Sequence, residues 1–452
     1  MIKGDRKPLI LFLTMTVGVL LGDLAVPALG ADIEIRKVLY LILGIVLLND
    51  LLNNKNSFRT TLHTLWPYTV LILIFVNYSS LRSISVAIEI IAFTAITVSL
   101  YVLYSSHLIR IKVYFWLQTL LTLFVILASL INNLVDLFGI ETSINWGYNV
   151  SYVINGVWKR EALLFKESTT FGFLMVCIAP FYIRVLLRTK PNVFYISGVG
   201  YAICLTFVGS FLATISILTY LLLAISLLDR LRRRACILFL CILTGSVLVN
   251  VTSRALNTSD IYIKFGTIAA LVNSYHTYSN RVTESGTESG TESLKLPKDY
   301  GGSLVLISHL QSLRERFNQE PVWKNLLGQG IGNYQDSYLR HIPEWSKDLW
   351  GPNGLAANDG GALAIRLLVE TGIIGFLVYV TLCLNLLNYI WKCTESVKKR
   401  LMFTLHIAMI AAFMLIRIPF YDEPIFYLTL ITIISLASRF RAQKPPLQPA
   451  KG

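Results

Sequence analysis

The sequence predicts an all-α integral membrane protein with about 12 transmembrane helices and one large loop outside the membrane. Three observations lead to this prediction. Hydrophobic residues make up 54% of the 452 residues and charged residues only 15%, whereas a soluble chain carries roughly 25% charge. Apolar runs long enough to cross a bilayer recur along nearly the whole chain. Lysine and arginine gather on alternate sides of these runs.

A bilayer core about 30 Å thick needs roughly 20 apolar residues per helix, and twelve runs approach this length. The run from 192 to 228 is read as two spans, because a single helix of that length would be about 55 Å long. Val208-Gly209-Ser210 offers a turn between them. The predicted spans are 8–29, 37–53, 65–80, 84–104, 112–132, 169–188, 192–209, 211–228, 235–252, 362–391, 401–418 and 423–438.

The distribution of basic residues predicts that both termini are cytoplasmic. Inner segments then hold 22 of the 40 lysines and arginines and the short outer segments only seven, while ten lie in the long loop, which the charge rule exempts. The net charge of +14 is therefore largely a matter of topology and does not indicate nucleic acid. The predicted parts are nine spans within 1–252 with a small outer loop at 133–168, the long outer loop 253–361, three spans within 362–440, and a cytoplasmic tail 441–452.

The first run has a second interpretation. Basic residues precede it and Ala28-Leu29-Gly30-Ala31 follows it, as in a secretory signal peptide, although the run is long for one. The cysteines argue against metal or redox chemistry, because all six fall in predicted spans or on the inner side without CxxC spacing. We expect no metal and no cofactor.

Within the long loop, a repeated TESG tract over 283–293 is too polar to bury a core and is expected to be mobile. Ser303–Phe317 carries apolar residues at helical spacing and predicts a helix. The glycine-rich run Leu327–Tyr334 follows, and it has no surrounding βαβ unit that would indicate nucleotide binding. Its glycines permit either tight turns or the close approach of a ligand.

Arg366 and Glu370 lie at the outer end of the predicted span 362–391, spaced i,i+4 and therefore on one helix face. Ionisable residues at membrane depth pair with each other or face a cavity. Both interpretations are open: a structural ion pair, or part of a functional site with Asn358 and Asp359 just upstream.

These segments resemble the O-antigen polymerase and ligase superfamily, whose members transfer polyprenyl-diphosphate-linked glycans outside the inner membrane. Leu327-Gly328-Gln329-Gly330-Ile331-Gly332-Asn333-Tyr334 is similar to the family's G-x-G-x-x-(F/Y) segment. Leu367–Gly375 is similar to its E-x-G-x-x-G signature, and Arg160 to Glu167, followed by Ser168, to its R…(E/P) segment. The resemblance implies a GT-C-like glycosyltransferase of the bacterial inner membrane.

Two departures favour the polymerase branch. The ligase branch carries His-Asn about nine residues before the signature glutamate, where this sequence has Gly361-Ala362. The family's arginine upstream of the glycine run has no clear counterpart, since His309 occupies that region and Arg314 comes a few residues late. A ligase-type transferase and a transporter or flippase remain alternatives, although no internal repeat of the kind found in transporters is visible.

The resemblance implies that an acceptor hydroxyl attacks the donor's anomeric carbon and that polyprenyl diphosphate leaves, with arginines stabilising the departing charge. The partners expected are a lipid-linked glycan donor and acceptor, the bilayer, and a flippase and chain-length regulator of the same pathway. The candidate catalytic residues are Arg366, Arg160, Glu370 and Asp359. The candidate substrate-binding residues are Arg314, Glu167, Gly328, Gly330, Asn333, Tyr334, His341, Asn358 and Arg417.

Overall fold

A computed structural model describes the greater part of the chain. The described residues are 10–11, 14, 25–28, 31–104, 111–137, 153–154, 158–159, 168–208, 210–255, 301–344, 346–347, 352, 354, 362–393, 396–417, 429 and 434. The TESG tract and the last predicted span, apart from residues 429 and 434, lie outside them.

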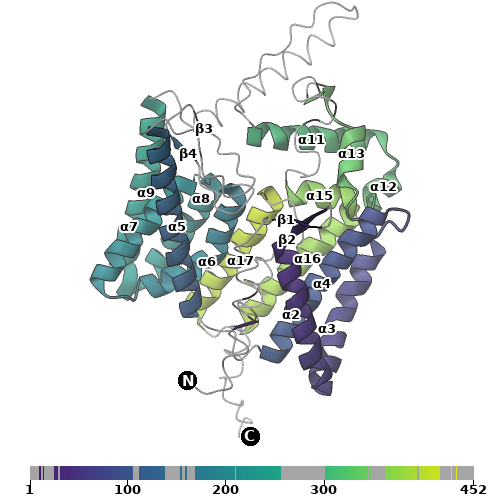
Figure 1. Cartoon of the computed structure of the whole chain (residues 1–452), viewed down its shortest axis with the longest axis horizontal. Coiled ribbons are helices and arrows are strands. Elements are labelled where there is room, and N and C mark those ends of the chain that lie inside the picture. The colour runs from purple at the N-terminus through teal and green to yellow at the C-terminus, as the bar shows by residue number, and fades with distance from the viewer. Residues whose placement is uncertain are drawn as a thin grey trace, which may run out of the picture.

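Helices dominate the described part of the chain (Figure 1), as the sequence predicts. The strands described form two short antiparallel hairpins, β1 (Ala25–Ala28) with β2 (Ala31–Glu34) and β3 (Val153–Ile154) with β4 (Trp158–Lys159). The longer helices of the first half are α2 (Ile35–Leu52), α3 (Lys55–Ile74), α4 (Leu81–Tyr104), α5 (Ile111–Leu137), α6 (Ser168–Leu186), α7 (Pro191–Val208), α8 (Phe211–Leu227) and α9 (Arg232–Ala255), with a 3-10 turn η2 (Asp229–Leu231) before α9. The later helices are α11 (Gly301–Gln319), α12 (Val322–Leu327), α13 (Tyr334–Arg340), α15 (Leu363–Glu370), α16 (Gly372–Cys393) and α17 (Val397–Arg417).

Three of the described helices are long and apolar enough to cross a membrane: α4, α16 over Gly372–Lys392, and α17. A fourth span results if α8 and α9 are taken together, although they are bent by 117° at the break between them. The chain is therefore a helical membrane protein.

The helix break expected near 208–210 is confirmed, because α7 ends at Val208 and α8 begins at Phe211 after the N-cap Ser210. The prediction for 8–29 is wrong at its end, where residues 25–28 form strand β1. Pro27 lies within that strand, and proline is unfavourable in a helix interior.

The prediction of one continuous span over 362–391 is also wrong. The helix stops at Glu370, and a new helix begins at Gly372, whose φ of 68° is a left-handed conformation that glycine adopts readily. Arg366 and Glu370 therefore lie on the short helix α15, which precedes the apolar span α16 instead of forming part of it.

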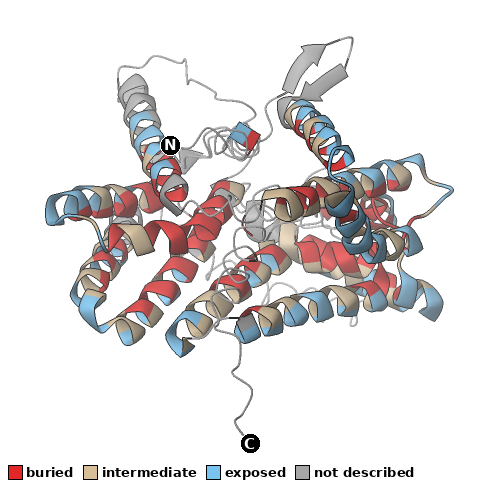
Figure 2. Cartoon of the chain, turned by 90° about the horizontal axis from the view of Figure 1, so that it is seen from below, coloured by how far each residue is buried: buried red, intermediate tan, exposed pale blue. Residues whose placement is uncertain are grey.

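Two groups of helices make up the molecule (Figure 1). α5, α6, α7, α8 and α9 pack against one another, and α2, α3 and α4 form the second group. α17 packs against α6 and α8 of the first group and against α15 and α16, which connects that group to the end of the molecule where α11, α12, α13 and α15 gather. The burial pattern in Figure 2 shows buried residues running along the inner faces of these helices.

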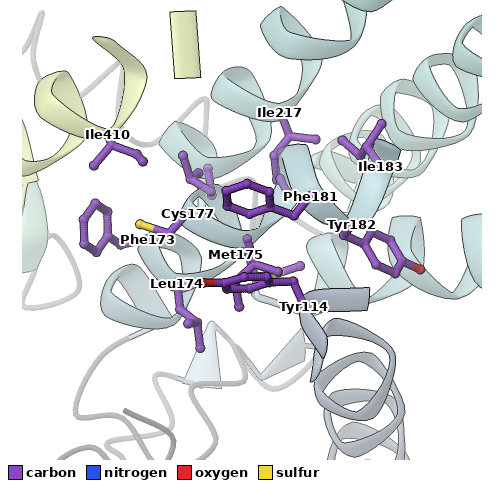
Figure 3. Packing of buried hydrophobic residues seen from close by; sticks show 14 of the residues in the cluster. Tyr114, Phe173, Leu174, Met175, Cys177, Phe181, Tyr182, Ile183, Ile217 and Ile410 are labelled. Atoms are coloured by element: carbon purple, nitrogen blue, oxygen red, sulfur yellow. The ribbon is translucent and has the colours of Figure 1, made fainter. Parts of the chain in front are cut away.

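Helix α6 is the centre of the main core. It is apolar on every side, which is the pattern of a helix surrounded by protein, and its residues from Phe171 to Ile183 are almost completely buried. Figure 3 shows Tyr114 of α5, Ile217 of α8 and Ile410 of α17 around it. Close packing of apolar side chains stabilises this core.

Candidate functional site

The C-terminal end of α15 is held by hydrogen bonds from other parts of the chain. The last four carbonyl groups of a helix have no partner within the helix, and in α15 each of them accepts a hydrogen bond. From Leu367 to Glu370, the donors in order are Thr371, the Arg316 guanidinium at 3.0 Å, the Gln329 amide at 3.0 Å and the Gly330 amide at 2.8 Å. The glycine run and a buried arginine therefore cap this helix.

Glycine is required where the glycine run meets the break between α15 and α16. A Cβ atom on Gly328, which has a φ of 78°, would lie 2.2 Å from the Glu370 carbonyl oxygen. A Cβ on Gly372 would lie 2.2 Å from the carbonyl oxygen of Leu326. These glycines therefore allow a close approach of backbone to backbone within the protein, which is a structural use that the sequence did not indicate.

The connection between α3 and α4 completes the surroundings of the glycine run. The Ile331 amide donates to the Phe75 carbonyl at 2.9 Å, and Ser80 donates through Oγ to Asn333 Oδ1 at 2.7 Å. Asn333 in turn donates to the Gln329 carbonyl at 3.0 Å. These contacts join segments about 250 residues apart, and nothing in the sequence pattern indicates them.

Arg366 and Glu370 form the ion pair that their spacing allows. Arg366 Nε lies 3.0 Å from Glu370 Oε1, and the two side chains are 7% and 0% exposed. The same oxygen accepts from the Tyr334 amide at 3.3 Å. The pair is thus buried and tied to the last residue of the glycine run, so that three predicted site residues meet at one point.

A buried aromatic and hydroxyl cluster lies beyond Tyr334. The Tyr334 hydroxyl and His309 Nδ1 are hydrogen-bonded at 2.5 Å, and the His309 ring lies 4.3 Å from that of Tyr338. The Tyr338 hydroxyl and Ser308 are 2.6 Å apart. The bond from His309 fixes the position of the Tyr334 hydroxyl.

Arg316 is a buried arginine that the sequence did not single out. Arg314, the predicted one, is exposed on α11. Two residues further on, Arg316 is fully buried, donating to the carbonyls of Leu368 at 3.0 Å and Lys324 at 2.8 Å. Burial lowers the pKa of its guanidinium, while Glu320 nearby acts in the opposite direction. Only the three-dimensional arrangement shows which of the two arginines points inward.

The remaining predicted site residues are separate from this cluster or outside the described residues. His341 is buried and hydrogen-bonded through Nδ1 to the Ser337 carbonyl at 2.9 Å. Arg417 is half-buried at the end of α17, the helix that packs against α15. Four predicted residues lie outside the described part of the chain: Arg160, Glu167, Asn358 and Asp359.

An apolar groove of about 730 Å³ runs between α2, α3 and α4. Its lining includes Leu41, Ile45, Leu62 and Ile96, with Lys37 and Glu89 at one end. These two charged side chains form an ion pair at 3.3 Å. α3 and α4 are joined by the same connection that contacts the glycine run, so the groove and the cluster share supporting elements.

Fold and site together define a helical membrane protein in which a glycine run and a buried arginine–glutamate pair are joined beside the start of an apolar span. Comparison with protein-family models, with curated proteins and with solved structures gives no match for this chain. The resemblance to the polymerase and ligase superfamily therefore rests on the motif residues themselves.

Proposed function

We propose that this protein is a polysaccharide polymerase that joins polyprenyl-diphosphate-linked oligosaccharides on the outer face of a bacterial inner membrane. In this proposal the chain has about 12 spans and both termini are cytoplasmic. One observation is the main support for this proposal. The two family-like segments, 40 residues apart, are joined through the bonds of Gln329 to Val369 and Gly330 to Glu370.

The proposed reaction breaks the bond between the donor's anomeric carbon and its diphosphate and forms a glycosidic bond to an acceptor hydroxyl. The electron pair leaves with the polyprenyl diphosphate, and the hydroxyl proton passes to a base. Arginine suits the leaving group because its planar guanidinium binds phosphate oxygens through two donors and stays protonated. We assign this role to Arg366, with Arg160 as the second cation and Arg417, at the end of α17, as a further one.

Glu370 is better suited to positioning than to proton transfer. Its carboxylate is fully buried, and Oε1 already accepts from both Arg366 and Tyr334. These bonds fix the orientation of the guanidinium of Arg366. The proposed base is instead Asp359, just upstream of α15. The apolar groove between α2, α3 and α4 suits the polyprenyl chain.

The test uses a strain from which the gene is deleted, complemented with variants, and resolves its surface polysaccharide by size. Arg366→Lys keeps a positive charge but loses the bidentate geometry, and we expect chains shortened to one or a few repeat units. Arg160→Ala is expected to have the same effect. Arg340→Lys, the same change at an exposed arginine on α13, is the matched control and should give full-length polymer.

The deletion itself separates the alternatives. Single repeat units attached to their final carrier support a polymerase, whereas long polymer left unattached indicates a ligase. Unchanged surface glycan contradicts both. Full-length polymer from both Arg366→Lys and Arg160→Ala would contradict the assignment of the arginines.

A further inference from the structure

Helix α12 has its polar side inside and its apolar side outside. Val322, Trp323, Leu326 and Leu327 are 74%, 59%, 39% and 49% exposed, and their spacing places them on one face. Asn325, on the opposite face, is buried and donates to the carbonyls of Phe317 at 3.1 Å and Glu320 at 3.4 Å. A helix in water normally shows the reverse arrangement.

The position of α12 explains this reversal. Gly372 is the first residue of the apolar span α16, and it packs directly against the Leu326 carbonyl of α12. The glycine run that follows α12 is bonded to Ser80, which immediately precedes the apolar span α4. Two candidate spans therefore begin beside α12, which places this helix at the depth where the hydrocarbon core ends.

The apolar span that packs against α12 is itself little buried by protein. Only 11% of the apolar window of α16 is buried inside the protein. Ile374 and Leu377, in the first turns of α16, are exposed apolar residues. α12 packs against α16 and lies at the periphery of the molecule beside the end of α3 and α4 (Figure 1).

The residue types of α12 match the membrane–water boundary. Tryptophan is enriched at that depth, and lysine keeps its ammonium in water while its stem covers apolar surface. Lys324 Nζ lies 5.7 Å from the centre of the Trp323 ring and 2.7 Å from Glu320 Oε2. The charged group is therefore bonded to Glu320, just after α11, and lies over the ring of Trp323 at the border of the apolar face.

We infer that α12 is an interfacial helix whose Val322, Trp323, Leu326 and Leu327 face inserts into the bilayer leaflet on its side. The inference does not depend on the proposed function. If that function holds, the inserted helix keeps the glycine run, which follows it directly, at the level of the lipid headgroups.

The experiment places the full chain in lipid nanodiscs that hold one copy each. Val322→Cys is labelled with the environment-sensitive fluorophore NBD, and Glu315→Cys, exposed on the neighbouring helix α11, is the matched control. The unsubstituted protein, labelled in parallel, corrects for the native cysteines. Phosphatidylcholine carrying a nitroxide near its headgroup quenches fluorophores inserted at the interface. We expect roughly twofold stronger quenching at position 322 than at position 315.

Each of the following three outcomes would contradict the inference. Equal quenching at the two positions, with equal access to aqueous iodide, would place α12 in water. A blue-shifted probe that neither quencher reaches would show that another segment of this chain covers the face. Shielding that appears only in discs with two copies would identify a second copy as the partner. If Val322→Cys does not fold, Trp323→Cys provides the same measurement.

Discussion

The core around α6 and the cap at the end of α15 are both buried, yet they are held together by different interactions. Around α6, Phe173, Phe181 and their neighbours pack by shape, and Figure 3 shows apolar side chains from α5, α8 and α17 filling the space. At α15, the backbone carbonyls each have one directional partner, and two glycines leave no room for a Cβ atom.

The difference predicts a difference in tolerance to mutation. Apolar packing accepts substitutions of similar volume, typically at a cost below about 1.5 kcal/mol. Hydrogen bonds to buried carbonyls do not tolerate such substitutions, because each lost donor leaves a carbonyl oxygen without a partner. Residues at the cap should therefore be more sensitive than residues in the larger core.

The largest effect is expected for Gly328→Ala. The new Cβ would collide with the Glu370 carbonyl, and φ is positive, so we expect the free energy of unfolding to fall by about 3–5 kcal/mol. Gly44→Ala in α2 is the control, because its nearest neighbour would be 3.7 Å away. Helix propensity predicts a gain of up to about 1 kcal/mol there. Thermal unfolding in detergent measures both, and equal losses would contradict the close approach.

A smaller effect is expected for Arg316→Met. The substitution keeps the length of the side chain and removes two bonds from a charged donor to carbonyls of α15 and α12. We expect a loss of about 2–3 kcal/mol. Hydrogen exchange should become faster at the amides of Gln329 and Gly330, which bond to the neighbouring carbonyls.

Arg314→Met on the same helix is the matched control, and it should change stability by less than about 0.5 kcal/mol. Unchanged exchange at Gln329 and Gly330 in Arg316→Met would show that the glycine run alone caps α15.

A smaller effect is expected at a directional contact within the core, that of His406. Pro180 lies inside α6 and lacks an N–H for the Val176 carbonyl, and its ring crowds the preceding turn of the helix. His406 of α17 donates through Nε2 to the next carbonyl, that of Cys177, at 3.1 Å. We expect His406→Leu to cost about 1 kcal/mol. In a Pro180→Ala background the cost should be smaller, because the continuous helix satisfies its own carbonyls. Additive single and double mutants in thermal unfolding would show that the contact is unrelated to the proline.

The ion pair between α11 and α12 should make stability depend on pH. The Lys324 ammonium bonded to Glu320 holds the pKa of that carboxyl below its usual 4.5. A carboxyl with a depressed pKa stabilises the fold above its unfolded pKa, and this contribution is lost as the pH falls through the folded pKa. Glu320→Gln should therefore flatten the acid limb of the unfolding profile. The same substitution would leave that limb unchanged if the pair contributed nothing.

Local patterns in the sequence were sufficient for several features. The helix expected over 303–317 is present as α11, the break at 208–210 separates α7 from α8, and Arg366 and Glu370 form the ion pair that their spacing allows. Each depends on residues within a few positions of one another. Helix periodicity, glycine and i,i+4 contacts are set by such short-range geometry.

The buried face of α11 was not predictable in this way. Its apolar residues suggest that Leu310 points inward, but Leu310 is exposed while Ser308, Ser312 and Arg316 are buried. The helix turns its polar side to the protein because the carbonyls at the end of α15 and the tyrosine hydroxyls lie there. The same holds for α12. Amphipathicity indicates which sides of a helix differ, and the surroundings decide which side is inside.

The sequence by itself determined that the chain is a helical membrane protein, because composition and run length depend on no distant contact. The sequence also singled out the glycine run and the arginine–glutamate pair as candidate parts of a site. Only the tertiary structure decided that these segments cap one another, that α15 ends before α16, and that Arg316 is the buried arginine. Each of these depends on backbone atoms about 40 or more residues apart, and such contacts leave no periodic pattern along the chain.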